Sequence, residues 1–418
     1  MQLDKPSVRK ALAAATCTLL ATSLQIESVQ AKDKKWEVNA TGFFYTEPDR
    51  ISVYEEILYL KKEIGDNEFL SIKRTHDILT GASPTGEAEP VSTATFTSPS
   101  GSKLVTNAGD TPLGEFQDIR TAYNFSWNKP LTRFLSGSFS ANYSYEYDYM
   151  SIGMSSLFAK DLEGRKTTLN LGLSGSFDRI KPLGGIPTGG NSTSDTTRYR
   201  WDQKLVLDYL LGVTRVLNRR ALATLTYMRG LAGGYLTDPY KIFSILKSDG
   251  VTPDGATHFE NRPESRSTSS VHLRVLRNRS DKKRRGDVID SNYRYFWDDW
   301  GIISHTAELR YRMAVKNKKG KLSPNDEHYT GHLRLYRQSA ADFYTYGIPV
   351  GQVIPDFVSS DYRLANMATA TLGLGWGRDI YKDVKIKLRG EYLYQWYLNS
   401  ELNPLSALSA QASLYYDF

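Results

Sequence analysis

Residues 408–418 read Leu-Ser-Ala-Gln-Ala-Ser-Leu-Tyr-Tyr-Asp-Phe, and apolar and polar side chains alternate along them almost without a break. Successive side chains of a β-strand point to opposite faces, so this segment predicts a strand with one apolar and one polar face. A soluble sandwich could use such a strand, but seldom as the terminus with a final exposed Phe. An outer-membrane β-barrel uses such strands throughout, because lipid covers one side of its wall and a wet lumen the other.

The same alternation recurs along most of the chain, at residues 36–44, 119–127, 139–149, 169–177, 205–213, 271–275, 307–315, 368–376 and 384–396. Several runs reach about 10 residues, which is longer than the ~5 to 6 of globular strands and suits a tilted membrane crossing. Their apolar sides carry Tyr or Trp near the ends, as an interfacial aromatic girdle requires. The pattern predicts an all-β fold, a single antiparallel transmembrane β-barrel.

The composition narrows the class of protein further. Among 418 residues, 12% are aromatic and 24% are charged. No segment beyond the first 31 residues approaches the ~20 apolar residues that a membrane-spanning helix needs, so a helical membrane protein is excluded. A soluble secreted β-protein stays open as an alternative to the barrel.

The first 31 residues resemble a secretory signal peptide. Lys5, Arg9 and Lys10 form a basic start, residues 11–24 are mostly apolar, and Val29-Gln30-Ala31 offers a small-residue cleavage site. We therefore expect a cleaved signal peptide at 1–31, a barrel domain at 32–418 and localisation in a bacterial outer membrane. Cys17 is the only cysteine, so the remaining chain has no disulfide and no thiolate metal site.

The lengths of the connections predict the topology. Short connections occur at residues 128–133, 217–220 and 377–383, and long polar ones at 79–115, 230–267 and 338–363. Outer-membrane barrels pair short periplasmic turns with longer outer loops. With Phe418 on the periplasmic side, all six fall on the expected sides if a further weak strand lies in residues 180–196. Adding hairpin strands near 51–62 and 67–77 gives about 16 strands, with 14 as the alternative.

Three short segments resemble a known bacterial family. They are Thr80-Gly81-Ala82-Ser83-Pro84-Thr85-Gly86, Gly212-Val213-Thr214-Arg215-Val216-Leu217-Asn218 and Gly234-Tyr235-Leu236-Thr237-Asp238-Pro239-Tyr240-Lys241. They are similar to signature stretches of the domain-of-unknown-function family numbered 3570, and the resemblance covers essentially the whole mature chain. It implies an exported, porin-like outer-membrane barrel of Gram-negative bacteria with no established activity, in an envelope redox context. It implies no catalytic residues.

The polar sides of the late strands carry many charges. The residues expected to point inward are His272, Arg274, Glu308, Arg310, Arg312, Arg334, Lys385, Lys387, Arg389 and Glu391. With His neutral, seven cations face two anions, an excess of five positive charges. A cation facing lipid near the midplane costs about 2 to 4 kcal/mol, so we expect these side chains to face the lumen. They could form a basic wall that concentrates anions in an open pore. They could instead pair with acids such as Asp148, Asp178 and Asp208 in a filled lumen.

No enzymatic chemistry is predicted. Of the six histidines, only His328 and His332 are close in sequence, and on a strand they would lie about 13 Å apart, too far for one metal. No spacing selects a catalytic Ser, His and Asp set, and no phosphate-binding loop is present. We predict no catalytic residue, metal or cofactor. The basic runs 282–285 and 316–321 are interpreted as solvated periplasmic turns rather than as a nucleic-acid site.

The sequence therefore favours a channel or uptake port for small polar, possibly anionic solutes. The alternative is a closed barrel that serves as a scaffold or partner-binding component of an envelope redox or electron-transfer system, with a periplasmic redox partner. The expected partners otherwise are outer-membrane lipid, lipopolysaccharide and the barrel-assembly machinery, with no nucleic acid. We expect that machinery to recognise the C-terminal residues Leu414, Tyr416 and Phe418.

Overall fold

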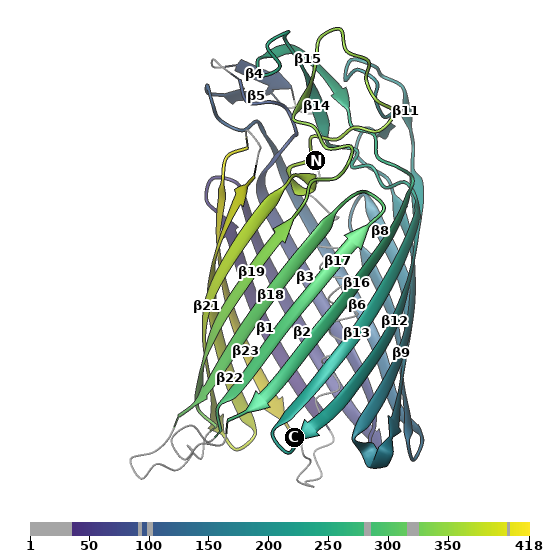
Figure 1. Cartoon of the computed structure of the whole chain (residues 1–418), viewed down its shortest axis with the longest axis vertical. Coiled ribbons are helices and arrows are strands. Elements are labelled where there is room, and N and C mark those ends of the chain that lie inside the picture. Colours follow the sequence, from purple (N-terminus) through teal and green to yellow (C-terminus); the bar gives the residue numbers. More distant parts are fainter. Residues whose placement is uncertain (1–35, 91–93, 98–102, 280–285, 316–325, 399–401) are drawn as a thin grey trace.

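The computed structural model of the chain describes residues 36–90, 94–97, 103–279, 286–315, 326–398 and 402–418. Sixteen antiparallel strands form a closed barrel with tilted strands (Figure 1). In chain order they are β1 (Trp36–Glu47), β2 (Ile51–Gly65), β3 (Glu68–Pro84), β6 (Leu113–Thr132), β7 (Leu135–Tyr145), β8 (Tyr149–Leu162), β9 (Thr167–Ile180), β12 (Asp202–Asn218), β13 (Ala221–Gly234), β16 (Ser265–Asn278), β17 (Val288–Asp298), β18 (Ile303–Ala314), β19 (His328–Gln338), β21 (Met367–Tyr381), β22 (Val384–Tyr397) and β23 (Leu405–Asp417). The predicted barrel and its strand number are confirmed, and the alternative of 14 strands is wrong.

The two terminal strands close the barrel. β1 pairs with β23 in antiparallel register, with Val38 opposite Tyr416 and Gly42 opposite Ala412. The backbone N–H of Trp36 donates to the carbonyl of Phe418 at 2.9 Å, so both ends of the barrel chain lie at the same rim. We call this rim the turn end, and the opposite rim the loop end.

One strand was predicted in the wrong place. Ile180 ends β9, and residues 181–196 hold no barrel strand. They lie in the β9–β12 connection, whose short strands β10 (Ile186–Pro187) and β11 (Arg198–Tyr199) pair with each other. Pro182 and Pro187 cannot donate to a ladder, which disfavours a long strand there. The missing strand is β8, whose alternation is broken by Ser156 on the outer face and Leu157 on the inner face.

The connections otherwise follow the prediction. The three short ones lie at the turn end with Phe418, and the three long ones lie at the loop end (Figure 1). The loop end also carries the β4 (Ala94–Thr97) and β5 (Lys103–Thr106) hairpin and the short helix η2 (Tyr362–Leu364). Helix η1 (Glu163–Arg165) joins β8 to β9. Among the described residues, no helix is long and apolar enough to cross a membrane.

Apolar side chains cover the outside of the barrel. Leu171, Leu211 and Leu388 are exposed although they are large and apolar, and each belongs to an alternating row. The small buried cores lie instead at the loop end, for example around Trp300, Ile302 and Leu364. This inside-out distribution is that of a transmembrane barrel, in which lipid takes the place of a protein core.

Candidate functional site in the lumen and its cap

The seven basic residues predicted for the inner wall alternate with outward apolar ones. Leu309, Leu333 and Leu388 are exposed on the outer face of β18, β19 and β22, so their sequence neighbours lie on the inner face. The same parity holds for Arg274 beside exposed Leu273 on β16. The seven residues on this inner face are Arg274, Arg310, Arg312, Arg334, Lys385, Lys387 and Arg389.

Most of the arginines pair with acids nearby. Arg274 donates a bidentate pair of hydrogen bonds to the Asp290 carboxylate on β17, at 2.9 and 2.7 Å. Arg310 lies 2.7 Å from Glu308, and Arg312 lies 2.7 Å from Asp326. The Arg274–Asp290 pair joins β16 to β17, and the Arg312–Asp326 pair joins β18 to the residues before β19, while the Arg310–Glu308 pair lies within β18.

The acids expected as partners contact other groups. Asp178 receives Lys204 at 3.1 Å, and Asp208 accepts a hydrogen bond from Ser174 at 3.2 Å. Asp148 accepts a hydrogen bond from the hydroxyl of Tyr240 at 3.2 Å. The proposed pairing of the basic wall with these three aspartates is therefore wrong, because the barrel places them on or above other strands.

His332 is the centre of a longer network. Its Nε2 lies 3.3 Å from Glu308 on β18, and its Nδ1 hydrogen-bonds Glu391 on β22. Arg389 donates to the same Glu391 oxygen through Nε at 2.7 Å. Strand β21 lies between β19 and β22, and Gly373 is its inward residue at this level. A Cβ there would lie 2.7 Å from the Glu391 carboxylate, so the missing side chain lets Glu391 cross to His332.

Three cations of this wall have no carboxylate within ion-pair distance among the described residues. Arg334, Lys385 and Lys387 make no ion pair with any residue of the described ranges, and Lys387 stacks over Tyr415 at 4.6 Å. Arg334 and Lys387 are exposed although they point inward, so there is room for water beside them. Asp379 on β21 also faces inward, directly opposite Lys385 in the register. The seven cations therefore share this wall with the five carboxylates of Asp290, Glu308, Asp326, Asp379 and Glu391, which leaves two positive charges in excess.

The opposite part of the inner wall is acidic. Its inward residues include Glu55 and Asp77 on β2 and β3, and Asp178 and Asp208 on β9 and β12. Arg120 pairs with Asp77. The described inner surface thus has a basic side on β16–β22 and a more acidic side on β2–β12.

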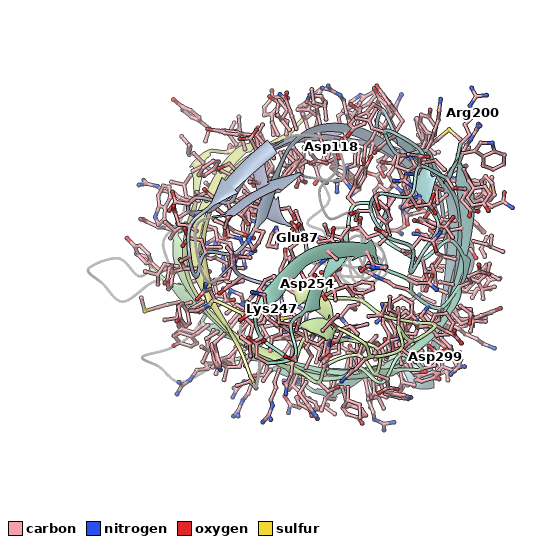
Figure 2. All side chains as sticks on the ribbon, turned by 90° about the horizontal axis from the view of Figure 1, so that it is seen from above. Glu87, Asp118, Arg200, Lys247, Asp254 and Asp299 are labelled. Atoms are coloured by element: carbon pink, nitrogen blue, oxygen red, sulfur yellow. The ribbon has the colours of Figure 1, made fainter. Side chains whose placement is uncertain are left out.

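A folded cap covers the loop end. Strand β14 (Ile242–Leu246) pairs antiparallel with β15 (Pro253–Phe259) and parallel with β20 (Gly347–Pro349). Seen along the barrel, this sheet crosses the middle of the mouth, where Lys247, Asp254 and Glu87 are labelled (Figure 2). Phe243 and Val358 form its apolar core and are almost fully buried. We call these loop segments, residues 85–90, 235–264 and 339–366, the cap.

A buried ionic cluster joins the two longer cap loops. Arg262 lies 2.7 Å from Glu260 and 2.6 Å from Asp361, and all three are almost completely buried. Arg363 also contacts Asp361 and lies 3.2 Å from Asp238. Burying so many charges is tolerable only because each has a partner of opposite sign.

The segment that carried the strongest family resemblance lies in this cluster. Asp238 pairs with Arg363, while the hydroxyl of Tyr240 accepts the N–H of Leu183 at 2.9 Å. Lys241 donates to Ser83 at 3.3 Å and to the carbonyl of Pro84. The segment therefore fastens three loops at the mouth. Sequence reasoning missed this role, although the density of hydrogen-bonding groups in the segment was a usable signal.

Glu87 is a buried titratable group at the edge of the cap. Its segment runs beside β14, since Ile242 donates to the carbonyl of Thr85 at 3.1 Å and Ala88 donates to Ser244 at 3.0 Å. The Glu87 carboxylate accepts a hydrogen bond from Thr85 Oγ1 at 2.8 Å and is only 7% exposed. Burial raises the pKa of the Glu87 carboxyl to about 7.

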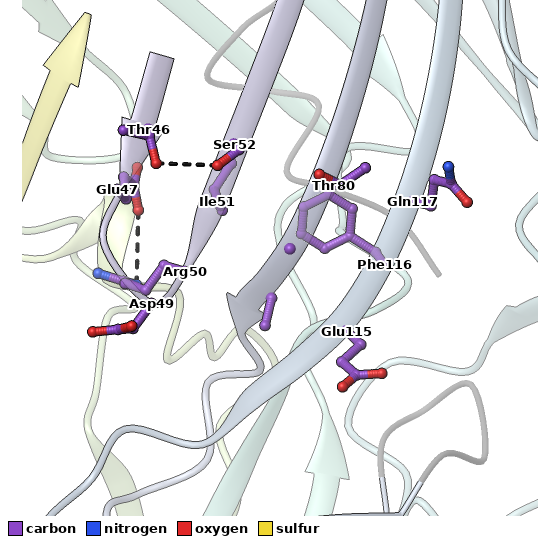
Figure 3. Close-up of a pocket in the computed structure, with 12 residues that line it drawn as sticks. Thr46, Glu47, Asp49, Arg50, Ile51, Ser52, Thr80, Glu115, Phe116 and Gln117 are labelled. Atoms are coloured by element: carbon purple, nitrogen blue, oxygen red, sulfur yellow. Dashed lines mark hydrogen bonds and ion pairs between the residues drawn. The ribbon is translucent and has the colours of Figure 1, made fainter. Parts of the chain in front are cut away.

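A separate pocket of about 900 Å³ lies at the loop end of β1, β2, β3 and β6 (Figure 3). The side chains of Thr46, Ser52, Thr80 and Gln117 line it, and they share the parity of the outward Tyr54. Thr46 and Ser52 hydrogen-bond each other at 3.0 Å. The pocket belongs to the outer rim and does not open from the basic wall.

No metal centre is evident in the part of the chain that the structure describes, where no three His, Cys, Asp or Glu side chains converge on one point. His328 is instead placed beside Arg312, 3.2 Å away. The basic runs 282–285 and 316–321 and the expected signal peptide lie outside the described residues, so their roles stay predictions.

The closed wall, its apolar exterior and its charged interior define an outer-membrane β-barrel. The chain belongs to the family described as a protein of unknown function, DUF3570, whose model matches residues 9–415. The resemblance seen in the sequence is thereby confirmed. None of the curated proteins matches this chain.

Several solved outer-membrane proteins are similar in fold. A bacterial polysaccharide outer membrane secretin aligns with TM-score 0.48 and 9% identity over 93% of this chain and 100% of its own. The Pseudomonas putida toluene transporter TodX aligns with TM-score 0.40 and 10% identity over 93% and 90%. Pseudomonas aeruginosa OccK3 aligns with TM-score 0.42 and 8% identity over 92% and 96%. At these values the likeness is limited to general barrel architecture.

Proposed function

We propose that this protein is a passive outer-membrane channel for small polar solutes, with a preference for anions. The observation that carries the proposal is the group of inward cations that form no ion pair with a described residue, Arg334, Lys385 and Lys387. Lys and Arg rings lining a pore attract negative permeants and repel cations. The acidic residues on the inner face of β2–β12 repel anions. An anion is therefore most stable along the basic side of the lumen.

The ion pairs of the wall support an open rather than a packed interior. The Arg310 and Arg389 side chains are 43% and 38% exposed although both are paired, so they line a space instead of filling it. A lumen filled by interlocking side chains would bury these guanidinium groups. We therefore place the permeation path along β18, β19 and β22.

The orientation in the membrane is part of the same proposal. Short turns of outer-membrane barrels lie in the periplasm and longer loops outside the cell. The turn end with Phe418 would then face the periplasm, and the cap would face the exterior. Residues 1–31 would direct export as a cleaved signal peptide, and Leu414, Tyr416 and Phe418 would serve the assembly machinery.

The cap favours a second candidate function. Its sheet lies across the mouth and is held by the buried cluster around Arg262. A barrel that this cap shuts permanently would act as a scaffold or partner-binding component of an envelope redox system. In the channel proposal, solutes enter the lumen beside the cap, or they enter when the cap opens.

Planar-bilayer recording on the purified protein separates the two functions. The channel proposal predicts steps of conductance for the wild type, and larger or longer openings when Arg262→Ala loosens the cap. Conductance that appears only in the Arg262→Ala variant would support the shut scaffold. No conductance in either protein would contradict the channel.

A further inference from the structure

The outer face of the barrel is uneven on one side. Leu374 on β21 is 77% exposed and Leu372 is 61% exposed, which makes them a ridge on this surface. The reason lies in the register, because the outward neighbours of Leu374 are Gly331 on β19 and Gly390 on β22. A large side chain between two glycines has nothing beside it to contact.

A groove runs next to this ridge. Its volume is about 810 Å³, and it crosses β22, β23 and β1. The register places Gly390 beside Ala410, and Ala412 beside Gly42, so the floor of the groove consists of the smallest residues. Larger apolar side chains form its borders, namely Phe44, Tyr54, Trp376 and Leu388.

The opposite wall also has one protruding side chain, Met154 at 70% exposure, but it has a more even stretch beside it. One row across β8, β9, β12, β13 and β16 consists entirely of large side chains: Phe158, Leu171, Leu211, Tyr227 and Val271. The corresponding row on the uneven side reads Gly331, Leu374, Gly390, Ala410 and Phe44. Fluid lipid tails fit either surface and do not require a ridge beside a groove.

Polar groups mark the same side. Glu56 lies at the edge of the groove, is exposed and points outward from β2 opposite His76 on β3, with Arg74 one outward position further along that strand. Within the described ranges, no residue hydrogen-bonds or ion-pairs with the Glu56 carboxylate. Arg229 on the far wall, in contrast, donates to Ser267 and Ser269. Ionisable groups on a membrane-spanning wall usually face protein rather than lipid.

We propose that two copies of this chain associate side by side in the membrane through this ridge and groove. Small residues at membrane interfaces let backbones approach closely, and packing then drives association. A two-fold interface needs a patch that is complementary to itself, and here the ridge and the groove lie on one patch. Leu374 of each copy enters the groove of the other. This patch carries both an acidic residue, Glu56, and a basic residue, Arg74. It is therefore complementary in charge to the same patch on a second copy, whereas a partner that carries charges of only one sign would match only one of the two residues. The proposal does not depend on conduction.

Cysteine cross-linking tests the contact directly, because Cys17 is the only cysteine and can be removed as Cys17→Ala. Leu374→Cys combined with Ala410→Cys should form a disulfide-linked dimer in outer membranes. Within one chain the two positions are two strands apart, about 10 Å, which is too far for a disulfide. The matched control is Leu171→Cys with Tyr227→Cys, which has the same two-strand spacing on the opposite wall. No dimer, or equal dimer in the control, would overturn the proposal.

A second variant tests the packing. Gly390→Leu fills the groove, and a Cβ at this position meets nothing nearer than the Ser409 carbonyl at 3.9 Å, so the barrel itself should fold. Mobility on unboiled gels checks that folding. Sedimentation in detergent should show at least a tenfold loss of dimer relative to wild type. An unchanged dimer fraction, or a wild type that is monomeric at all concentrations, would contradict the two-fold contact and leave lipid as the occupant.

Discussion

Glu391 on β22 hydrogen-bonds His332 on β19 across an intervening strand. The contact exists because Gly373 on β21 has no side chain, as a Cβ there would lie 2.7 Å from the Glu391 carboxylate. Glu308 lies 3.3 Å from the other ring nitrogen of His332, Nε2. The network thus spans β18 to β22 and braces the part of the wall that carries the basic residues.

Gly373→Val should destabilise the barrel by about 1–3 kcal/mol, because the valine displaces Glu391 and leaves buried His332 without that partner. Denaturant unfolding followed by tryptophan fluorescence measures the change. Gly331→Val is the matched control, since it adds the same side chain on the adjacent strand with no heavy atom within 4 Å. Equal stability of the two variants would argue against the bracing role.

The inner wall beside Arg334 should be wet. A cysteine introduced by Arg334→Cys, in a Cys17→Ala background, is expected to react quickly with a charged, membrane-impermeant thiol reagent. Leu335→Cys, one residue further and exposed on the outer face, should be protected by lipid and react far more slowly. Similar rates at both positions would mean that the inner face is not lined by water.

Arg262→Ala should release the cap and spare the barrel. Removing one partner of a buried ion pair costs about 3–5 kcal/mol, and here Glu260 and Asp361 would both lose their shared guanidinium. We expect protease cleavage in residues 235–264 at a rate at least tenfold above wild type, with an intact barrel fragment. Lys247→Ala, an exposed change in the same cap, should leave cleavage unchanged.

The attachment of residues 85–89 to the cap should depend on pH. The pKa of the Glu87 carboxyl is raised from about 4.5 to about 7 by burial, so the folded cap binds its proton more tightly than the unfolded loop does. The resulting stabilisation is fully present below pH 4.5 and is lost as the pH rises through 7. Proteolysis near Glu87 should therefore accelerate from pH 5 to pH 8 in wild type, relative to Glu87→Gln measured at each pH. A constant ratio between the two proteins would exclude this titration.

The sequence predicted the barrel because alternation is local and covers most strands, as in β22 and β23. It misplaced one strand because β8 breaks the alternation, with Ser156 on its outer face and Leu157 on its inner face. The prolines Pro182 and Pro187 in residues 180–196 are turn signals that argue against a strand there. The alternation in the sequence identified which charged residues of β16–β22 lie on the same face of the sheet. It does not show which residues lie opposite one another on neighbouring strands. The Arg274–Asp290 pair and the bridge over Gly373 depend on register. The cap cluster joins Asp238, Arg262 and Asp361 from two loops, which no local pattern brings together.

The central claim is that the inner-wall cations Arg334, Lys385 and Lys387 select the permeating ion. The reversal potential across a planar bilayer with a salt gradient tests this claim most directly. The wild type should show the sign of an anion-selective pore, and Arg334→Glu with Lys385→Glu and Lys387→Glu should shift it towards cation selectivity. Lys62→Glu changes a charge on the outer face near the same end and should leave the potential unchanged. A wild type selective for cations, or a triple variant with the potential of the wild type, would contradict the account.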